Sequence, residues 1–333
     1  MSSPRQANIV VLAKDPNDPA NSALYESMPS GSKVVATVSS MEEFAEVDEE
    51  TVKGVNVLFT SWSNKEVVTE ALNRFPSVEW VHARSAGVEH IICPALVSHP
   101  CKLTNARGCF SSTLAEYTMM SCSYFAKDLP RLMRQKADRK WDQYCVKELR
   151  GSTLGVVGYG DIGKACARLA KAYGMRIVAL KRNPVEDDVA DVCYGGDGLG
   201  TLMSECDYVV VAAPLTEKTR GMVGEKALGM AKKGSVLINL GRGPIVDEKA
   251  MIKALESGRL SGLALDVFET EPLPEDHELW GLDNVLLSPH NMDMTETFME
   301  EATEAFKTGW LVKFLAGEDV GGFPNLVQKE EGY

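Results

Sequence analysis

Three polar residues of this sequence could together transfer a proton to the carbonyl group of a carboxylated molecule. Arg242 follows the apolar segment "SVLINL", Glu271 lies shortly after "GLALDVF", and His290 follows "NVLLSP". A carboxylate hydrogen-bonded to an imidazole stabilises the protonated ring and fixes its tautomer, so such a ring can donate a proton to a carbonyl oxygen. A guanidinium binds a carboxylate through two parallel hydrogen bonds, and Gly241 and Gly243 beside Arg242 predict a mobile backbone that suits this task. Taken singly, each of the three residues is as well explained by a salt bridge or a turn.

A second pattern predicts a dinucleotide site. Gly158, Gly160 and Gly163 have G-x-G-x-x-G spacing directly after the apolar run 154–157, and the strand-like segment "RIVAL" closes the unit. In such a unit the first glycine permits a tight turn, the second lets a pyrophosphate approach the backbone, and the third lets helix and sheet pack closely. The helix N-terminus offers N–H groups to the phosphates. The alternative is a structural glycine-rich turn. The apolar face expected for the helix consists of Ile162, Ala165, Cys166, Leu169 and Tyr173.

The residues after "RIVAL" bear on the choice of dinucleotide. An acidic residue there would accept hydrogen bonds from the adenosine ribose of NAD and repel a 2′-phosphate. This chain has Lys181, Arg182 and Asn183 instead. Two cations can bind the 2′-phosphate, so the sequence predicts NADP in preference to NAD. The alternative is that both cations are solvated surface charges and that NAD binds through other contacts.

Apolar, β-branched runs alternate with helical patterns along the chain, which predicts an α/β fold with parallel sheets. A long helical stretch over 111–141, interrupted at Pro130, separates two sets of strands, and its apolar first half suits burial against another domain or subunit. The carboxyl ends of parallel strands lie along one edge of a sheet, where ligands bind. The polar or turn-forming residues expected at this edge are Lys181, Pro214, Arg242, Asp266 and His290.

Composition narrows the class of protein. A length of 333 residues favours two domains, and 25% charged residues are ordinary for a globular chain. The net charge of −12 argues against nucleic acid or an anionic membrane as a partner. No segment has the length of a membrane span, and the first residues lack a signal-peptide pattern. The 8 cysteines are scattered without C-x-x-C pairs, which predicts reduced thiols, a cytoplasmic protein and no metal site.

Several segments resemble the D-isomer-specific 2-hydroxyacid dehydrogenase family. They are "GYGDIG", "NLGRGPIVDEKAMIKALESGRLSGLALDVFETEPLP" and "LLSPHN". The order and approximate spacing of Arg242, Glu271 and His290 match the catalytic set of that family. The segment "SAGVEHI" at 85–91 is similar to the substrate loop of the family, so the resemblance spans most of the chain.

The resemblance implies roles for individual residues. His290 would be the acid/base, Glu271 would tune it, and Arg242 would hold the substrate carboxylate and polarise the keto group. Backbone N–H groups of the substrate loop would bind the carboxylate, and its residues are Ala86, Gly87 and Val88. Side-chain selectivity would depend on loops near Trp62 and Arg84 and on the partner subunit. The cofactor site would comprise Gly158, Tyr159, Gly160, Asp161, Ile162 and Gly163 at the pyrophosphate, Lys181, Arg182, Ala213 and Pro214 at the adenosine, Asp266 at the nicotinamide carboxamide, and Leu240, Gly241, Arg242 and His290 beside them.

The family layout implies a Rossmann-type doubly wound parallel sheet and a smaller flavodoxin-like substrate domain. The substrate domain would be discontinuous, with residues 1–110 and 299–333, and residues 111–298 would form the dinucleotide-binding domain. A cleft with hinge closure is expected at their junction. The helix after residue 111 matches the dimer-forming region of the family, so a homodimer is expected. Lys181 departs from the usual Asp of the family, and Met292 stands where many members have a small residue.

The expected activity is reduction of a small 2-keto acid, such as glyoxylate or hydroxypyruvate, to the D-2-hydroxy acid with NADPH favoured over NADH. One alternative is an NAD-dependent D-3-phosphoglycerate or D-lactate-type dehydrogenase. Phosphoglycerate enzymes often have additional C-terminal regulatory domains, whereas this sequence ends after its last predicted helix. An alternative of another class is a non-catalytic, dinucleotide-sensing corepressor-like protein, which would be expected to have long disordered flanks that this sequence lacks.

Overall fold

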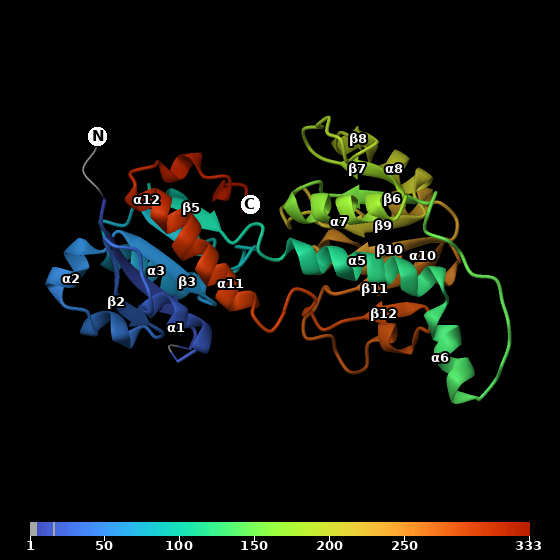
Figure 1. The fold of residues 1–333 in the computed structure, drawn as a ribbon, viewed down its shortest axis with the longest axis horizontal. Coiled ribbons are helices and arrows are strands. Elements are labelled where there is room, and N and C mark those ends of the chain that lie inside the picture. Colours follow the sequence, from blue (N-terminus) through green and yellow to red (C-terminus); the bar gives the residue numbers. More distant parts are fainter. Residues whose placement is uncertain (1–4, 16) are drawn as a thin grey trace. The chain divides into compact units, whose positions relative to one another are not determined.

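The computed structural model describes residues 5–15 and 17–333, and the chain divides into two units. Unit 1 comprises Met1–Phe110 and Glu296–Tyr333, and unit 2 comprises Ser111–Thr295. Each unit contains one sheet with helices on its faces (Figure 1). The α/β fold class with parallel sheets predicted from the sequence is thereby confirmed.

The sheet of unit 1 has the strand order β13-β5-β4-β3-β1-β2, and only the short edge strand β13 runs antiparallel to its neighbour. The five parallel strands thus have the flavodoxin-like order 2-1-3-4-5. The strands are β1 (Ala7–Ala13), β2 (Ser32–Val38), β3 (Val57–Ser61), β4 (Trp80–Ala83), β5 (Lys102–Asn105) and β13 (Leu326–Val327). The helices are α1 (Pro19–Tyr25), α2 (Glu49–Gly54), α3 (Lys65–Arg74), α4 (Pro94–Ser98), α11 (Phe298–Ala305) and α12 (Val312–Leu315), with the π-helical segment η5 (Phe306–Leu311) between the last two.

The sheet of unit 2 is parallel throughout, with the order β12-β11-β10-β9-β6-β7-β8. Counted along the chain this is the order 3-2-1-4-5-6 of a Rossmann fold, extended by one strand. The strands are β6 (Thr153–Val157), β7 (Arg176–Leu180), β8 (Val192–Tyr194), β9 (Tyr208–Val211), β10 (Ser235–Asn239), β11 (Leu260–Leu265) and β12 (Val285–Leu287). The helices are α5 (Ser111–Ala126), α6 (Leu129–Ala137), α7 (Asp161–Ala172), α8 (Leu199–Glu205), α9 (Glu225–Met230) and α10 (Glu248–Glu256), with the 3-10 turns η3 (Gly243–Ile245) and η4 (Glu278–Gly281).

The helical stretch is interrupted close to Pro130, as predicted: the break lies at residues 127–128, and Pro130 occupies the first turn of α6. Asp128 adopts a left-handed conformation between the two helices, and its side chain accepts a hydrogen bond from the Arg131 N–H. The apolar residues of α5 are mostly buried within unit 2 itself, because α5 packs along α7 and beside β10. The ring of Phe125 lies so close to Gly262 of β11 that a Cβ there would be 2.3 Å from it. Burial against another domain or subunit is therefore not needed to explain the apolar character of α5.

The predicted apolar face of α7 is correct for Cys166 and wrong for Tyr173, and Ile162, Ala165 and Leu169 are only partly buried. The buried residues are Gly163, Cys166, Ala167 and Ala170, whereas Tyr173 is 48% exposed. Small side chains let α7 approach the sheet and α5 closely, and the Cys166 Sγ lies 3.3 Å from the Thr118 hydroxyl. The size of the side chains, not their hydrophobicity, decides which face of this helix is buried.

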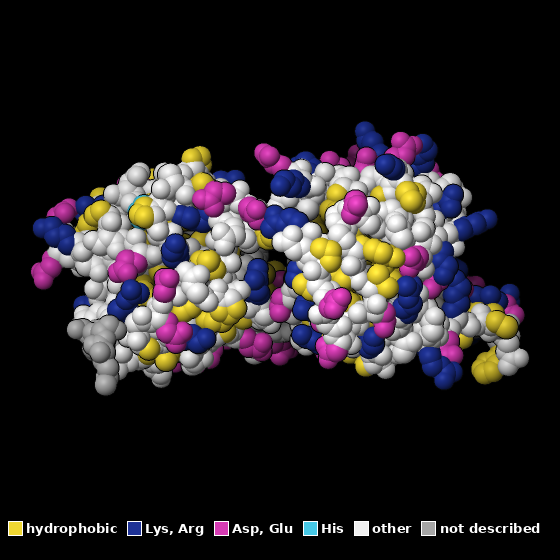
Figure 2. Space-filling view, turned by 90° about the horizontal axis from the view of Figure 1, so that it is seen from above, with side chains coloured by type: hydrophobic (Ala, Val, Ile, Leu, Met, Phe, Trp, Pro, Cys, Tyr) yellow, Lys and Arg dark blue, Asp and Glu magenta, His cyan; other side chains and the backbone are white. Residues whose placement is uncertain are grey.

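The surface of the protein carries both kinds of charge. Acidic and basic side chains are interspersed on the face drawn in Figure 2, so the negative net charge is not gathered there in one patch. Among residues 5–15 and 17–333, no helix has both the length and the apolarity needed to cross a membrane.

The core of unit 1 encloses an imidazole. His82 on β4 is 1% exposed and lies among the rings of Phe59, Trp80 and Phe306. The Thr104 hydroxyl accepts a hydrogen bond from the indole N–H of Trp80 at 2.8 Å, so its own proton is available to the His82 Nδ1, also at 2.8 Å. Burial lowers the pKa of His82 to about 3.

His82 should therefore make the free energy of unfolding depend on pH. Its pKa is about 3 in the folded protein and 6.5 without burial. The neutral ring stabilises the folded state fully above about pH 6.5, and this contribution is lost as the pH falls towards 3. The variant His82→Phe should reduce the slope of unfolding free energy against pH between about pH 6 and 4 by up to about 1.4 kcal/mol per pH unit. Urea unfolding monitored by circular dichroism measures this slope. His277→Asn is the control, and equal slopes for His82→Phe and wild type would contradict the prediction.

Candidate active site

The strands of unit 2 end in one row across the sheet. Backbone pairing joins Leu180, Val157, Val211, Asn239 and Leu265 in register, each with the next, and Leu265 is paired with Leu287. These residues are the last ones of β7, β6, β9, β10, β11 and β12. The loops that follow them consequently begin at one edge of the sheet, as predicted. Lys181 and Asp266 directly follow this row, and Arg242 and His290 lie three residues beyond it.

His290 and Glu271 form a hydrogen-bonded pair on two of these loops. The imidazole Nδ1 lies 2.7 Å from Glu271 Oε2, and the side chains are 39% and 34% exposed. The other carboxylate oxygen accepts a hydrogen bond from the Phe268 N–H at 2.9 Å, which fixes the orientation of the carboxylate. Because a carboxylate only accepts, Nδ1 carries the hydrogen and Nε2 is the nitrogen that remains available to a substrate.

The backbone of His290 is held in an uncommon conformation by a buried acid. His290 has a φ of 50°, in the left-handed region that non-glycine residues seldom occupy. Asp266, 2% exposed, accepts hydrogen bonds from the Ser288 hydroxyl at 2.7 Å and from the N–H groups of Asn291 at 3.1 Å and Met292 at 3.4 Å. Burial raises the pKa of Asp266, whereas the bonds from Ser288 and Asn291 oppose that rise. The family resemblance predicts Asp266 at the nicotinamide carboxamide, but nothing in the sequence predicted that Asp266 anchors the residues on both sides of His290.

Arg242 lies in a tightly packed turn between β10 and η3. The side chain is half-buried, and its Nη1 donates to the Gly241 carbonyl at 2.7 Å. A Cβ on Gly243 would lie 1.9 Å from the carbonyl carbon of Phe268, and one on Gly241 would lie 2.8 Å from the Ala213 carbonyl oxygen. Close packing thus accounts for both glycines without a mobile backbone: Gly243 allows the Arg242 turn to contact the loop that carries Glu271, and Gly241 allows it to contact the segment of Ala213.

The glycine-rich turn has the geometry of a pyrophosphate site. Gly158 has a φ of 97°, and a Cβ there would lie 2.5 Å from the Ala213 nitrogen. Gly160 begins α7 without a side-chain cap, and a Cβ there would meet no atom within 4 Å. Within the described chain, the N–H groups of Asp161, Ile162 and Gly163 have no hydrogen-bond acceptor. Unpaired donors at a helix N-terminus beside an open glycine suit phosphate oxygens, so these residues fit a dinucleotide.

The two predicted adenosine-side cations begin the loop after β7. Leu180, the last residue of β7, accepts hydrogen bonds from the N–H groups of both Gly158 and Tyr159 at 3.1 Å. Lys181 is half-buried and Arg182 is exposed. The structure thus joins the start of the cation-bearing loop directly to the glycine-rich turn.

In unit 1, the segment after β4 presents a set of backbone donors. The carbonyl of Ala86 accepts from the Asn105 side chain at 2.6 Å, and the carbonyl of Gly87 accepts from the Ser85 hydroxyl at 2.6 Å. The N–H groups of Ala86, Gly87 and Val88 have no acceptor among the residues that the structure describes. The carbonyls of this segment are thus engaged within the protein, whereas its N–H groups remain available. Such a set of N–H donors is suited to binding a carboxylate.

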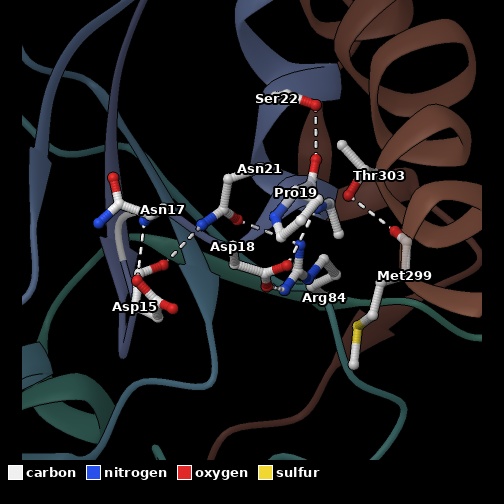
Figure 3. A network of polar contacts seen from close by, with 10 residues as sticks. Asp15, Asn17, Asp18, Pro19, Asn21, Ser22, Arg84, Met299 and Thr303 are labelled. Atoms are coloured by element: carbon white, nitrogen blue, oxygen red, sulfur yellow. Dashed lines mark hydrogen bonds and ion pairs between the residues drawn. The ribbon is translucent and has the colours of Figure 1, made fainter.

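Arg84, one residue before this segment, is a buried anchor. It is 2% exposed, and its guanidinium donates to Asp18 at 2.8 Å and to the Asn21 side chain at 3.1 Å (Figure 3). The guanidinium thereby ties the start of α1 to the end of β4. Trp62, directly after β3, is 47% exposed and has a φ of 58°. Trp62 and Arg84 were both expected near the loops that determine substrate selectivity, and of the two only the Trp62 side chain is exposed to solvent.

Known proteins resemble this chain over most of its length. Residues 119–291 match the family model "D-isomer specific 2-hydroxyacid dehydrogenase, NAD binding domain". The chain is 32% identical over 274 residues to a glyoxylate reductase of Thermofilum pendens, covering 80% of this chain and 79% of the relative. It is 31% identical over 311 residues to a D-3-phosphoglycerate dehydrogenase of Methanocaldococcus jannaschii, covering 91% of this chain but 57% of that longer protein.

A solved structure agrees with these relatives. The D-isomer specific 2-hydroxyacid dehydrogenase of Xanthobacter autotrophicus, in complex with NADPH and MES, has a TM-score of 0.83 and 27% identity, covering 98% of this chain and 100% of that one. Fold, site and relatives together define an NAD(P)-dependent oxidoreductase. The chain belongs to the D-isomer specific 2-hydroxyacid dehydrogenase family, which reduces 2-keto acids with NAD(P)H. The corepressor-like alternative is not supported.

Proposed function

We propose that the protein reduces glyoxylate, hydroxypyruvate or a similarly small 2-keto acid to the D-2-hydroxy acid, with NADPH preferred over NADH. The observation that carries this proposal is the 2.7 Å pair of His290 and Glu271 at the strand ends of unit 2. A bound nicotinamide would supply the hydride. In this proposal His290 Nε2 donates the proton to the keto oxygen, and Glu271 keeps the hydrogen of the ring on Nδ1.

Arg242 and the backbone of unit 1 complete the proposed substrate contacts. Arg242 binds the carboxylate and polarises the keto group, because its guanidinium is a forked donor that remains charged. The N–H groups of Ala86, Gly87 and Val88 bind the carboxylate from unit 1. We accordingly assign substrate binding to residues 1–110 and 299–333 and dinucleotide binding to residues 111–298.

The cofactor proposal rests on the glycine-rich turn and on the charges after β7. The pyrophosphate would bind the N–H groups at the start of α7, with Tyr159 and Ile162 beside it. Lys181 and Arg182 would bind a 2′-phosphate, for which NADH has no equivalent. The remaining residues of this proposed site are Ala213, Pro214, Leu240, Gly241 and Asp266.

The phosphoglycerate and D-lactate alternatives differ from this proposal in substrate, not in chemistry. A phosphorylated substrate needs cations beyond those that bind its carboxylate. In unit 1, Arg84 is buried and bonded to Asp18 and Asn21, so this guanidinium is already engaged inside the protein. This favours a small, unphosphorylated keto acid. Turnover of a panel of glyoxylate, hydroxypyruvate, pyruvate and 3-phosphohydroxypyruvate separates the candidates.

The wild-type protein should oxidise NADPH in the presence of glyoxylate or hydroxypyruvate, measured by the loss of absorbance at the nicotinamide band. His290→Ala should lower kcat by roughly 10²-fold to 10⁴-fold, because general acid catalysis contributes that much. Glu271→Gln should also lower kcat, by a smaller factor. His277→Asn is the matched control, since it removes an imidazole that lies 3.0 Å from Glu248 in the same unit. Turnover that survives in His290→Ala would overturn the assignment of the acid.

Reversal of the charges after β7 should change the choice of cofactor. Lys181→Asp with Arg182→Ala should lower the ratio of kcat/KM for NADPH over NADH by roughly 10-fold to 100-fold, because charge-assisted hydrogen bonds contribute about 1.5–3 kcal/mol. A control with the same change of net charge is Lys226→Asp with Lys249→Ala on exposed positions of α9 and α10. An unchanged ratio in the first double variant would refute the role of both cations.

We further propose that the protein is a cytoplasmic homodimer that associates through α6 and the segment after it. None of the described residues of α6 is buried, and Met133 and Trp141 are 67% and 92% exposed. Figure 2 shows hydrophobic side chains on this projecting segment. Arg131 braces it, with the guanidinium 4.0 Å from the ring of Tyr144 and 3.0 Å from Asp142. All 8 cysteines are free thiols, which supports a reducing compartment.

The mass in solution tests this association. Light scattering should give about twice 36.3 kDa for the wild type and a lower average mass for Met133→Asp with Trp141→Ala. Polar substitution of exposed apolar side chains weakens an interface that buries them. Trp280→Ala is the control, because Trp280 is also exposed, at 57%, but lies outside this segment. A wild-type mass of one chain would contradict the proposal.

A further inference from the structure

The connection from β7 to β8 lacks the helix that usually joins parallel strands. Residues 181–191 have no helical turn, yet they carry both proposed 2′-phosphate ligands. A crossover without a helix has few backbone hydrogen bonds of its own, so its order depends on other contacts. Lys181 donates its N–H to Tyr194 at the beginning of the segment, and Asp191 donates its N–H to Ile177 at the end.

Asp187 provides the contacts in the middle of this segment. Its Oδ1 accepts hydrogen bonds from the Tyr159 hydroxyl at 3.0 Å and from the N–H groups of Val189 at 3.1 Å and Ala190 at 2.9 Å. Its Oδ2 lies 3.0 Å from the ammonium of Lys164, and the Asp187 side chain is 19% exposed. One carboxylate thus joins three parts of the chain.

Two of these partners belong to the pyrophosphate end of the site. Tyr159 lies between Gly158 and Gly160 and is 1% exposed, and Lys164 lies in the first turn of α7, with its ammonium 5.3 Å from the centre of the Tyr159 ring. Burial raises the pKa of Tyr159, so its hydroxyl remains a donor. The Ala190 N–H, followed by Lys164 and Tyr159, lowers the pKa of Asp187, which keeps the carboxylate charged at neutral pH.

We propose that Asp187 is a positioning residue for cofactor selectivity: it fixes the loop of Lys181 and Arg182 at a set distance from the glycine-rich turn. This inference rests on the proposed preference for NADPH and adds the residue that maintains it. Pyrophosphate and 2′-phosphate are joined by a short, fairly rigid adenosine, so both binding groups are useful only if their separation is preserved. Lys164 balances the charge of Asp187, which reduces its repulsion of the phosphate.

Binding of two adenosine fragments to the full-length protein tests the proposal. Calorimetry gives the Kd of 2′,5′-ADP, which carries the 2′-phosphate, and of 5′-AMP, which lacks it. Asp187→Ala should raise the Kd of 2′,5′-ADP by about tenfold, equivalent to about 1.4 kcal/mol, and should change the Kd of 5′-AMP by less than about twofold. Asp187→Asn, which keeps an acceptor oxygen but not the ion pair, should have an intermediate effect.

Asp191→Ala is the matched control. Asp191 ends the same connection, lies 2.6 Å from the Lys171 ammonium and accepts from the Ile177 N–H at 2.7 Å, but it has no contact with the glycine-rich turn in the described structure. Its substitution should leave the ratio of the two Kd values unchanged. Amide hydrogen exchange of the free protein should quicken over residues 181–190 in Asp187→Ala only, which separates loop order from loss of the whole fold.

The outcomes distinguish this inference from the proposed function. A wild type that does not prefer 2′,5′-ADP would overturn the cofactor proposal and with it the selectivity role of Asp187. A wild type with the preference and an Asp187→Ala variant that retains it would overturn only the role of Asp187. Tighter binding of 2′,5′-ADP by Asp187→Ala would also overturn it, because the carboxylate would then act by repulsion.

Discussion

The chemistry of unit 2 depends on one constraint, the common row in which its parallel strands end. Because the pairing is in register from Leu180 to Leu287, residues more than a hundred positions apart in the sequence emerge at the same edge of the sheet. The hydrogen bonds between strands therefore fix the position at which each loop begins, and the loops carry the candidate site residues. A change of register in any strand would displace the functional residue that follows it.

Each functional loop is then fixed by a short-range contact of its own. The left-handed conformation of His290 costs of the order of 1–3 kcal/mol, and the buried Asp266 offsets this cost through bonds to Ser288, Asn291 and Met292. Hydrogen bonds to a charged group contribute about 1.5–3 kcal/mol each in favourable geometry. Asp266 thus holds the strained backbone that positions the imidazole of His290. Glu271 fixes the tautomer of that imidazole.

The sequence was sufficient for the features that follow from pattern and spacing. Alternating apolar runs predicted the parallel strands, and Pro130 predicted the break between α5 and α6. The pairing of His290 with Glu271 was also foreseen, because both residues follow strands that end at one edge. The short edge strands β8 and β13 were not foreseen.

Features that depend on contact between distant backbones could not be derived in this way. From the sequence, Gly243 was interpreted as a source of backbone flexibility beside Arg242. In the structure it is the residue at which the Arg242 turn contacts the loop that carries Glu271. Likewise, the apolar residues of α7 suggest one buried face, while close packing selects the face with the smallest side chains, Gly163, Ala167 and Ala170 among them. The periodicity of a sequence reports on one helix or strand at a time. The features above arise from contacts between two elements, so periodicity does not reveal them.

The same distinction explains how one fold can bind related cofactors. The glycine-rich turn and the start of α7 supply backbone N–H groups, which any dinucleotide can use and which few side-chain changes would remove. The residues that we propose to discriminate between cofactors, Lys181 and Arg182, lie in a connection without a helix, in which Asp187 accepts hydrogen bonds from Tyr159, Val189 and Ala190. Selectivity can therefore change without disturbing the sheet, because the groups that recognise the common part of the ligand and the groups that recognise its distinctive part are held by different interactions.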